Sequence, residues 1–220
     1  MAKWEYGSIY KHYNMDGEIK IGTGILKVHN IFDQLPEFMR QADVIFCDPP
    51  CSKANINSFY TKADRTDYQV DYLPFAKRFF ECIDEIKPKD LFVEVFKSNF
   101  DYFWNEITKR YKFVYVCPSK YYNSSKNKCW IIHGTNDQKH ALHLQPCENM
   151  DEAKIINYIC SNLDYKCIGD LCMGRGLVGW NAYINNKAFV GTELNKKRLA
   201  ILVHNITQGE LKNNEAENHP

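Results

Sequence analysis

Short apolar runs that alternate with stretches of helical spacing constrain the fold of this chain more than any other feature. Six runs predict buried parallel strands, at residues 24–29, 43–47, 90–95, 112–117, 166–169 and 188–191. Stretches of helical spacing lie at residues 72–86, 100–111, 151–163, 178–185 and 196–206. Strands that alternate with helices in this way form a parallel, doubly wound sheet with helices on both faces.

Residues 128–133 interrupt this alternation, because the loop before them is too short for a crossover helix, and they should pair antiparallel with the strand at 112–117. We therefore expect an α/β fold whose doubly wound, mostly parallel seven-stranded sheet has one antiparallel strand. With 220 residues the chain is long enough for one domain, which we place at residues 1–207. The polar segment 208–220 should be a disordered tail.

Composition narrows the classes of partner. A formal net charge of +1 excludes a general polycation, so any contact with nucleic acid must be a local patch. No apolar run approaches the ~20 residues of a membrane span, and the amino terminus lacks the apolar region of a signal peptide, so we expect a cytoplasmic protein. The nine cysteines never form Cys-x-x-Cys and the seven histidines show no ligand spacing, which indicates buried thiols and no metal.

The tetrapeptide Asp48-Pro49-Pro50-Cys51 directly follows the strand at 43–47. In a doubly wound sheet, ligands bind beyond the carboxyl ends of the strands. Two prolines fix φ and remove two donors, which leaves a rigid turn whose carbonyl oxygens can point at a substrate. Asp48 and the Pro49 carbonyl could accept both hydrogens of a primary amine and favour a pyramidal nitrogen that attacks a methyl group. The alternative is a turn that merely ends the strand.

A glycine-rich loop follows the strand at 166–169. Its candidate ligand contacts are Asp170, Leu171, Cys172, Met173, Gly174 and Gly176. Glycines let a loop pass close to a ligand, and the next helix presents backbone N–H groups. Glu193, about 20 residues on at the end of the next strand, can accept both ribose hydroxyls, as in dinucleotide sites. Sites for nicotinamide and flavin cofactors have the same combination of a glycine-rich loop and an acidic residue, but such cofactors do not explain the Asp-Pro-Pro turn.

Together these residues resemble the amino-methyltransferases of DNA, in which a (Asp/Asn/Ser)-Pro-Pro-aromatic motif is catalytic and Asp-x-Phe-x-Gly-x-Gly binds S-adenosylmethionine (SAM). The catalytic motif comes first here, as in the permuted β group, and the short chain looks like a phage-type form without a target-recognition domain. The resemblance implies a Rossmann-like methyltransferase fold with SAM as cofactor. It adds Asn30, Pro146, Leu194 and Asn195 to the cofactor site.

Cys51 departs from the family, which has an aromatic residue there to stack on the flipped base. Segment 52–71 could grip a strand of nucleic acid instead, with Phe59 or Tyr60 as the stacking ring, although an ordinary surface loop is the alternative. The candidate substrate contacts are Lys53, Phe59, Tyr60, Lys62 and Arg65.

Two further groups have alternatives of their own. The hairpin loop carries basic and aromatic residues that could contact phosphate or be solvated, namely Lys120, Tyr121, Tyr122, Lys126 and Lys128. Glu94 ends a buried strand, so it either faces the site or pairs with a nearby lysine.

The sequence thus predicts a SAM-dependent methyltransferase that acts on the exocyclic amino group of a nucleic-acid base in a bacterial or phage-infected cell. N6 of adenine in DNA is favoured, because Asp at the first motif position is commoner in the adenine enzymes of the family. DNA N4-cytosine and RNA adenine stay open as targets. A non-catalytic, methyltransferase-like subunit that holds nucleic acid also stays open. A homodimer or a partner subunit could supply target recognition.

Overall fold

The structure is a computed structural model that describes residues 7–66, 69–121 and 128–217. Within these residues one sheet has the strand order β1-β2-β8-β7-β3-β4-β6-β5. The strands are β1 (Glu18–Ile21), β2 (Gly24–Val28), β3 (Val44–Cys47), β4 (Asp90–Val95), β5 (Phe113–Lys120), β6 (Lys128–Thr135), β7 (Cys167–Asp170) and β8 (Ala188–Glu193). The helices are α1 (Lys53–Lys62), α2 (Tyr72–Ile86), α3 (Phe100–Thr108), α4 (Glu152–Asn162), α5 (Leu177–Ile184) and α6 (Lys196–Glu217), with short 3-10 turns η1 (Ile9–His12), η2 (Glu37–Gln41) and η4 (Gln145–Cys147).

The pairing of the strands confirms a doubly wound α/β fold. Strands β2, β8, β7, β3 and β4 are parallel neighbours. Strand β6 runs antiparallel to β5, as expected, and also pairs antiparallel with β4. The sheet of the described residues has eight strands rather than seven, because β1 pairs antiparallel with β2. With four residues at the edge of the sheet, β1 is too short to produce a clear period in the sequence.

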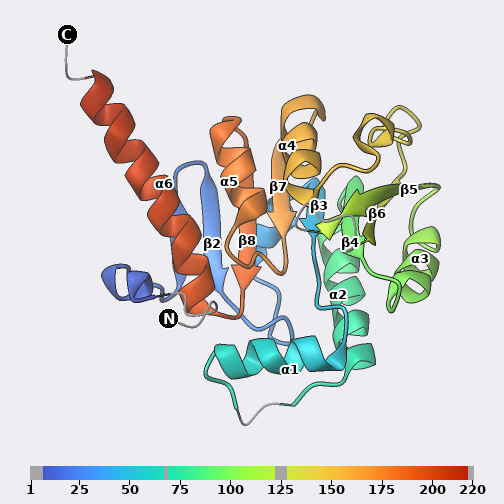
Figure 1. Ribbon diagram of the computed structural model, residues 1–220, viewed down its shortest axis with the longest axis horizontal. Coiled ribbons are helices and arrows are strands. Elements are labelled where there is room, and N and C mark those ends of the chain that lie inside the picture. Colours follow the sequence, from blue (N-terminus) through green and yellow to red (C-terminus); the bar gives the residue numbers. More distant parts are fainter. Residues whose placement is uncertain (1–6, 67–68, 122–127, 218–220) are drawn as a thin grey trace.

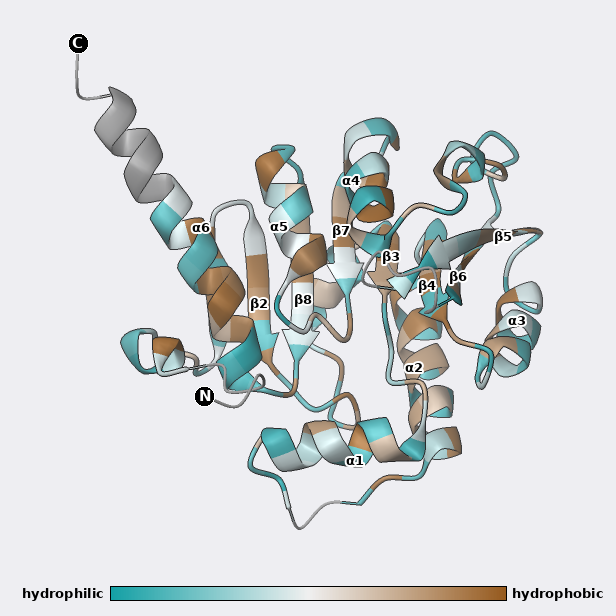
Figure 2. Ribbon diagram, viewed as in Figure 1, coloured by the Kyte–Doolittle hydropathy of each residue, from teal (hydrophilic) through white to brown (hydrophobic). Residues whose placement is uncertain are grey.

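Alternating side chains of the strands face two apolar layers. In β3, Val44 and Phe46 pack on the side of α4, α5 and α6, whereas Ile45 and Cys47 pack on the side of α2 and α3. Figure 1 shows the helices on both faces, and Figure 2 shows apolar residues both on the strands and on the helices that cover them. Both faces of the sheet are thus covered, which explains the continuous apolar runs of β3 and β4.

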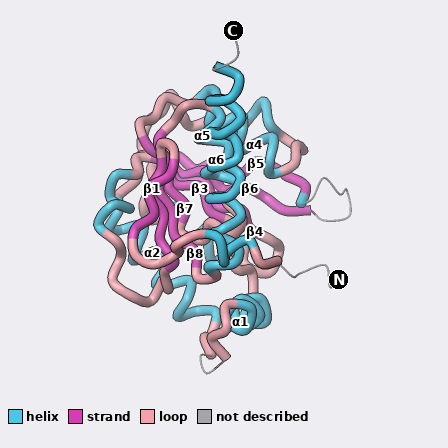
Figure 3. Tube along the Cα trace, turned by 90° about the vertical axis from the view of Figure 1, so that its left-hand side faces the viewer, coloured by secondary structure: helices cyan, strands magenta, loops and turns pink. Residues whose placement is uncertain are grey.

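Segment 52–71 is not a loop throughout, because α1 occupies its first half. Ser52 caps this helix by accepting a hydrogen bond from the Asn55 backbone N–H at 3.3 Å. Ile56 and Tyr60, one turn apart, are buried beneath it. Figures 1 and 3 show α1 lying beyond the carboxyl ends of the central strands. The helix therefore covers the edge of the sheet where a ligand would bind.

Helix α6 extends past the expected end at residue 206 and enters the segment expected to be a tail. It leaves the body of the protein at the upper left of Figure 1. Among the described residues, no helix is both long and apolar enough to cross a membrane.

Candidate functional site

A cavity of about 660 Å³ opens at the topological switch point between β7 and β3. From β7 the chain continues through α5 to β8 on one side, and from β3 it continues through α2 to β4 on the other. Loops therefore diverge at the carboxyl ends of these two strands and leave a crevice. The volume suits a nucleotide-sized ligand.

Most of the predicted site residues line this one cavity. They are Asn30, Asp48, Pro49, Pro50, Cys51, Phe59, Tyr60, Asp170, Leu171, Cys172, Met173, Gly174, Gly176, Glu193 and Leu194. The lining does not include Lys53, Lys62, Arg65, Pro146 or Asn195. The two motifs, far apart in sequence, thus face each other across a single space.

Two of the residues outside the lining have other contacts. Asn195 is buried at the start of α6, where its Oδ1 accepts from the Lys197 backbone N–H at 2.9 Å and its Nδ2 donates to the Lys62 carbonyl at 2.9 Å. Lys53 forms an ion pair with Asp71, with 2.5 Å between Nζ and Oδ1. Asn195 therefore joins α6 to α1 from outside the cavity wall.

Pro146 is exposed in η4, away from the cavity. The segment before β7 instead contributes Glu152, the first residue of α4, which lines the cavity. Asp151 caps α4 by accepting from the Lys154 backbone N–H at 3.1 Å, so the helix begins directly beside the site. In the sequence, Asp151 indicates the start of a helix, and so places Glu152 in its first turn.

The Asp-Pro-Pro turn is held from two sides. The Cys51 thiol donates to Asn55 Oδ1 of α1 at 2.7 Å, and the Ser98 hydroxyl donates to the Cys51 carbonyl at 3.4 Å. Burial and the nearby Asp48 raise the pKa of the Cys51 thiol, so the sulfur stays neutral. The turn is therefore rigid, and Cys51 fastens it to α1.

Glu193 holds the glycine-rich loop. Its Oε2 accepts from the Gly174 backbone N–H at 2.7 Å, and its Oε1 accepts from the Asn195 backbone N–H at 2.9 Å. Gly176 has φ of 84°, and a Cβ there would lie 2.5 Å from Leu202 Cβ. Each carboxylate oxygen keeps a further acceptor position for a ligand hydroxyl. The loop conformation thus depends on both the carboxylate and the glycine.

Asp170 shapes the same loop from its first residue. Its Oδ1 accepts from the Cys172 backbone N–H at 2.8 Å. Burial, which outweighs this hydrogen bond, raises the pKa of Asp170 to about 7, and repulsion from Glu193 adds to the increase. Leu171 and Met173, which follow Asp170 in this loop, contribute apolar surface to the cavity.

The two candidate stacking rings on α1 differ in their surroundings. Tyr60 is buried, and its hydroxyl donates to Asn30 Oδ1 at 2.7 Å. Phe59 is half-buried, with the Arg198 guanidinium carbon 5.1 Å and the Lys62 ammonium 5.7 Å from its ring centroid. Tyr60 is therefore held in the cavity wall by its hydrogen bond to Asn30, whereas the ring of Phe59 contacts two cationic side chains.

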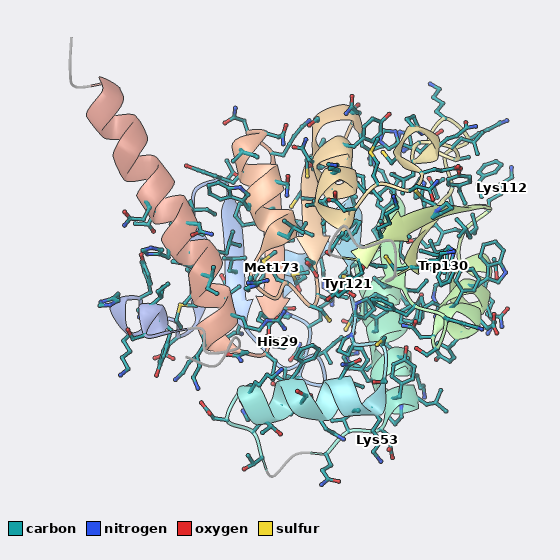
Figure 4. All side chains as sticks on the ribbon, in the orientation of Figure 1. His29, Lys53, Lys112, Tyr121, Trp130 and Met173 are labelled. Carbon is teal, nitrogen blue, oxygen red and sulfur yellow. The ribbon has the colours of Figure 1, made fainter. Side chains whose placement is uncertain are left out.

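Two other rings line the cavity. Phe96 directly follows β4, and its centroid lies 5.2 Å from that of Tyr121, with the planes at 80°. Tyr121 and Met173, both labelled in Figure 4, also line this cavity. For Tyr121 the sequence leaves phosphate contact and solvation open. It does not single out Phe96, although the place of Phe96 after a parallel strand is a signal. Tyr122 and Lys126 lie outside the described residues.

Three carboxyl groups form a cluster in the wall of the site. One oxygen each of Asp48, Glu94 and Glu152 lies within 4.8 Å of the others. Burial is the main reason that the pKa is raised to about 10 for Glu94, about 8 for Glu152 and about 7 for Asp48. Repulsion within the cluster adds to the increase for Glu94 and Glu152, and repulsion from Asp170 adds to it for Asp48. Glu94 is fully buried and is not among the residues that line the cavity. Neither of its oxygens has a hydrogen-bond partner among the described residues, so its neighbours are the other two carboxyl groups rather than a lysine.

No protein-family model matches the sequence, and no curated protein matches it as a relative. Solved structures do match the fold. The complex of M1.HpyAVI with SAM gives a TM-score of 0.55 at 13% sequence identity, over 82% of this chain and 98% of that chain. M1.HpyAVI alone gives 0.52 at 11% identity, over 82% and 97%. A protein of Thermus thermophilus named as a DNA modification methylase gives 0.53 at 10% identity, over 77% and 88%. This likeness confirms the expected Rossmann-like methyltransferase fold.

Proposed function

We propose that the protein is a SAM-dependent methyltransferase that methylates the exocyclic amino group of a nucleic-acid base. One observation carries the proposal: the Asp-Pro-Pro turn and the glycine-rich loop with Glu193 line the same cavity. The fold likeness to a DNA modification methylase and to a SAM complex supports DNA as substrate and SAM as cofactor.

The residues of the cavity fit SAM. Glu193 can accept from ribose hydroxyls, the backbone at Gly174 and Gly176 allows close approach, and Leu171 and Met173 offer apolar contact. When bound, SAM supplies an electrophilic methyl group. On the protein side, Asp48 and the Pro49 carbonyl would orient the amine and hold its lone pair toward the methyl group. Phe96 and Tyr121 would supply the ring that Cys51 lacks.

Adenine N6 in DNA is our preferred target, from the resemblance of the Asp-Pro-Pro motif, and N4 of cytosine and RNA adenine are the alternatives. Arg175 lines the cavity and is exposed, so it offers a positive charge for a phosphate at the mouth. A homodimer or a partner subunit would supply recognition of the target sequence.

Transfer of labelled methyl groups from SAM to mixed DNA and RNA, followed by nucleoside mass spectrometry, tests the proposal. We expect N6-methyladenine from the native protein and none from Asp48→Ala. Asp64→Ala, which removes an exposed carboxylate paired with Lys197, is the matched control and should retain activity. The absence of product on every substrate, despite tight binding of SAM, would instead favour a non-catalytic subunit that holds nucleic acid.

A further inference from the structure

The carboxylate cluster of Asp48, Glu94 and Glu152 is drawn together from three elements. Asp48 follows β3, Glu94 lies on β4, and Glu152 begins α4. Val93 and Val95 pack toward α2, so Glu94, between them in the alternation of the strand, points toward α4. The three side chains therefore converge on the α4 side of the sheet from segments that are remote in sequence.

Glu94 is the unusual member of the cluster. Its side chain is 0% exposed, and neither carboxylate oxygen has a hydrogen-bond partner among the described residues. A buried carboxyl without a partner is costly, and two further carboxyls beside it increase the cost. A cation among the three oxygens would remove both penalties.

We propose that Asp48, Glu94 and Glu152 bind a divalent cation of the hard, oxygen-preferring class, such as Ca²⁺, Mn²⁺ or Mg²⁺. Carboxylate oxygens are the ligands that these ions prefer. Two ligands of one ion cannot lie farther apart than twice the metal–oxygen distance, which is about 5 Å for Ca²⁺ and about 4 Å for Mg²⁺. The three oxygens lie within 4.8 Å of one another, so a small rotation of the side chains would bring all three to the bonding distance of one ion.

The cation would join the Asp-Pro-Pro turn to β4 and to the start of α4. One oxygen of Asp48 would then face the ion, and the other would stay available to the cavity that Asp48 lines. The ion is thus a positioning element for Asp48. The three carboxylates are distant in the chain, so no short spacing of ligands in the sequence indicates this site.

Titration of the full chain with Mn²⁺ tests the proposal, with the free ion measured by electron paramagnetic resonance and neither SAM nor nucleic acid present. We expect one saturable site per chain, displaced by Ca²⁺, and a Kd at least ~10-fold higher in Glu94→Gln and in Glu152→Gln. Glu81→Gln removes a carboxylate from the opposite face of the protein, on α2, and should bind as the native chain does. Circular dichroism confirms that each variant is folded.

Two results would overturn the metal site: no saturable binding of Mn²⁺ at millimolar concentration, or an affinity that neither Glu94→Gln nor Glu152→Gln reduces. Should Glu94→Gln fail to fold, the half-buried Glu152 still tests the site. Because the assay contains no SAM and no nucleic acid, its outcome is separate from that of the proposed methyl transfer. Mn²⁺ binding without methyl transfer would refute the reaction alone, and methyl transfer without Mn²⁺ binding would refute the cation site alone.

Discussion

Replacing Glu193 by glutamine should both loosen the glycine-rich loop and weaken the binding of SAM. The native carboxylate accepts from the Gly174 and Asn195 backbone N–H groups at 2.7 and 2.9 Å, and it is 6% exposed. Glutamine has nearly the same shape, but one of its two terminal atoms is a donor. In either orientation of the amide, an NH₂ group would therefore face a buried N–H.

The magnitude follows from these two hydrogen bonds. Losing one bond to a charged acceptor costs about 1.5–3 kcal/mol, and the remaining bond weakens when its acceptor becomes neutral. The substitution also removes repulsion between Glu193 and Asp170, but burial is the larger cause of the raised pKa of Asp170, so the relief is smaller. We expect a net loss of about 2–3 kcal/mol, or a Tm lower by about 4–12 °C in a chain of this size.

Urea unfolding and calorimetric titration with SAM at low temperature separate the two effects. SAM affinity should fall at least ~10-fold, which corresponds to about 1.4 kcal/mol of lost hydroxyl contacts. Glu37→Gln changes an 86% exposed side chain and should alter neither quantity. A free energy of unfolding within about 0.5 kcal/mol of the native value would refute the loop anchor. Reduced stability with unchanged SAM affinity would refute the placement of the ribose on Glu193.

Three further outcomes are expected. Gly176→Ala, with φ of 84° and a Cβ 2.5 Å from Leu202 Cβ, should lower the free energy of unfolding in urea by about 2–5 kcal/mol. Gly209→Ala is the control, because a Cβ there meets nothing closer than 3.8 Å and should not lower this free energy. Equal stability of the two variants would contradict the strain at Gly176. Phe96→Ala should raise the KM for nucleic acid about 5–100-fold through ~1–3 kcal/mol of lost stacking, and an unchanged KM would remove Phe96 from the substrate site. Burial lowers the pKa of His143 to about 4. Between about pH 6.5 and about pH 4 the imidazole is therefore protonated in the unfolded chain and neutral in the folded chain, so the free energy of unfolding should fall as the pH drops through this range. His143→Phe should flatten this slope by up to one proton, and an identical slope would contradict the assignment.

Three of the predicted site residues share one property: each lies at the carboxyl end of a parallel strand. Asp48 follows β3, Asp170 ends β7 and Glu193 ends β8, and the carboxyl ends of parallel strands meet at one edge of the sheet. Apolar runs identify such strands without any knowledge of packing. The sequence alone therefore predicts that residues at these strand ends lie close together.

Residues placed by packing could not be found in this way. Helix α1 has few apolar positions, so the sequence does not distinguish it from a loop. The hydrogen bond from Tyr60 to Asn30 depends on where this helix packs. The sequence places Pro146 at the cofactor site, but the residue of this segment that lines the cavity is Glu152, at the start of α4 after η4. The meeting of Glu94 with Glu152 depends on where α4 lies over β4, which no periodicity encodes.

The absence of an aromatic ring at Cys51 has a structural reason that links these observations. Cys51 donates to Asn55 of α1, so this position fastens the turn to the helix that covers the cavity. A ring there would displace that contact and crowd the space beside α1. Because β3 and β4 are adjacent parallel strands, Phe96 reaches the same cavity from the next strand end, with Tyr121 packed against its edge. We therefore expect Cys51→Tyr to impair the enzyme unless α1 moves, and improved binding of nucleic acid by that variant would show that the cavity still has room for the missing ring.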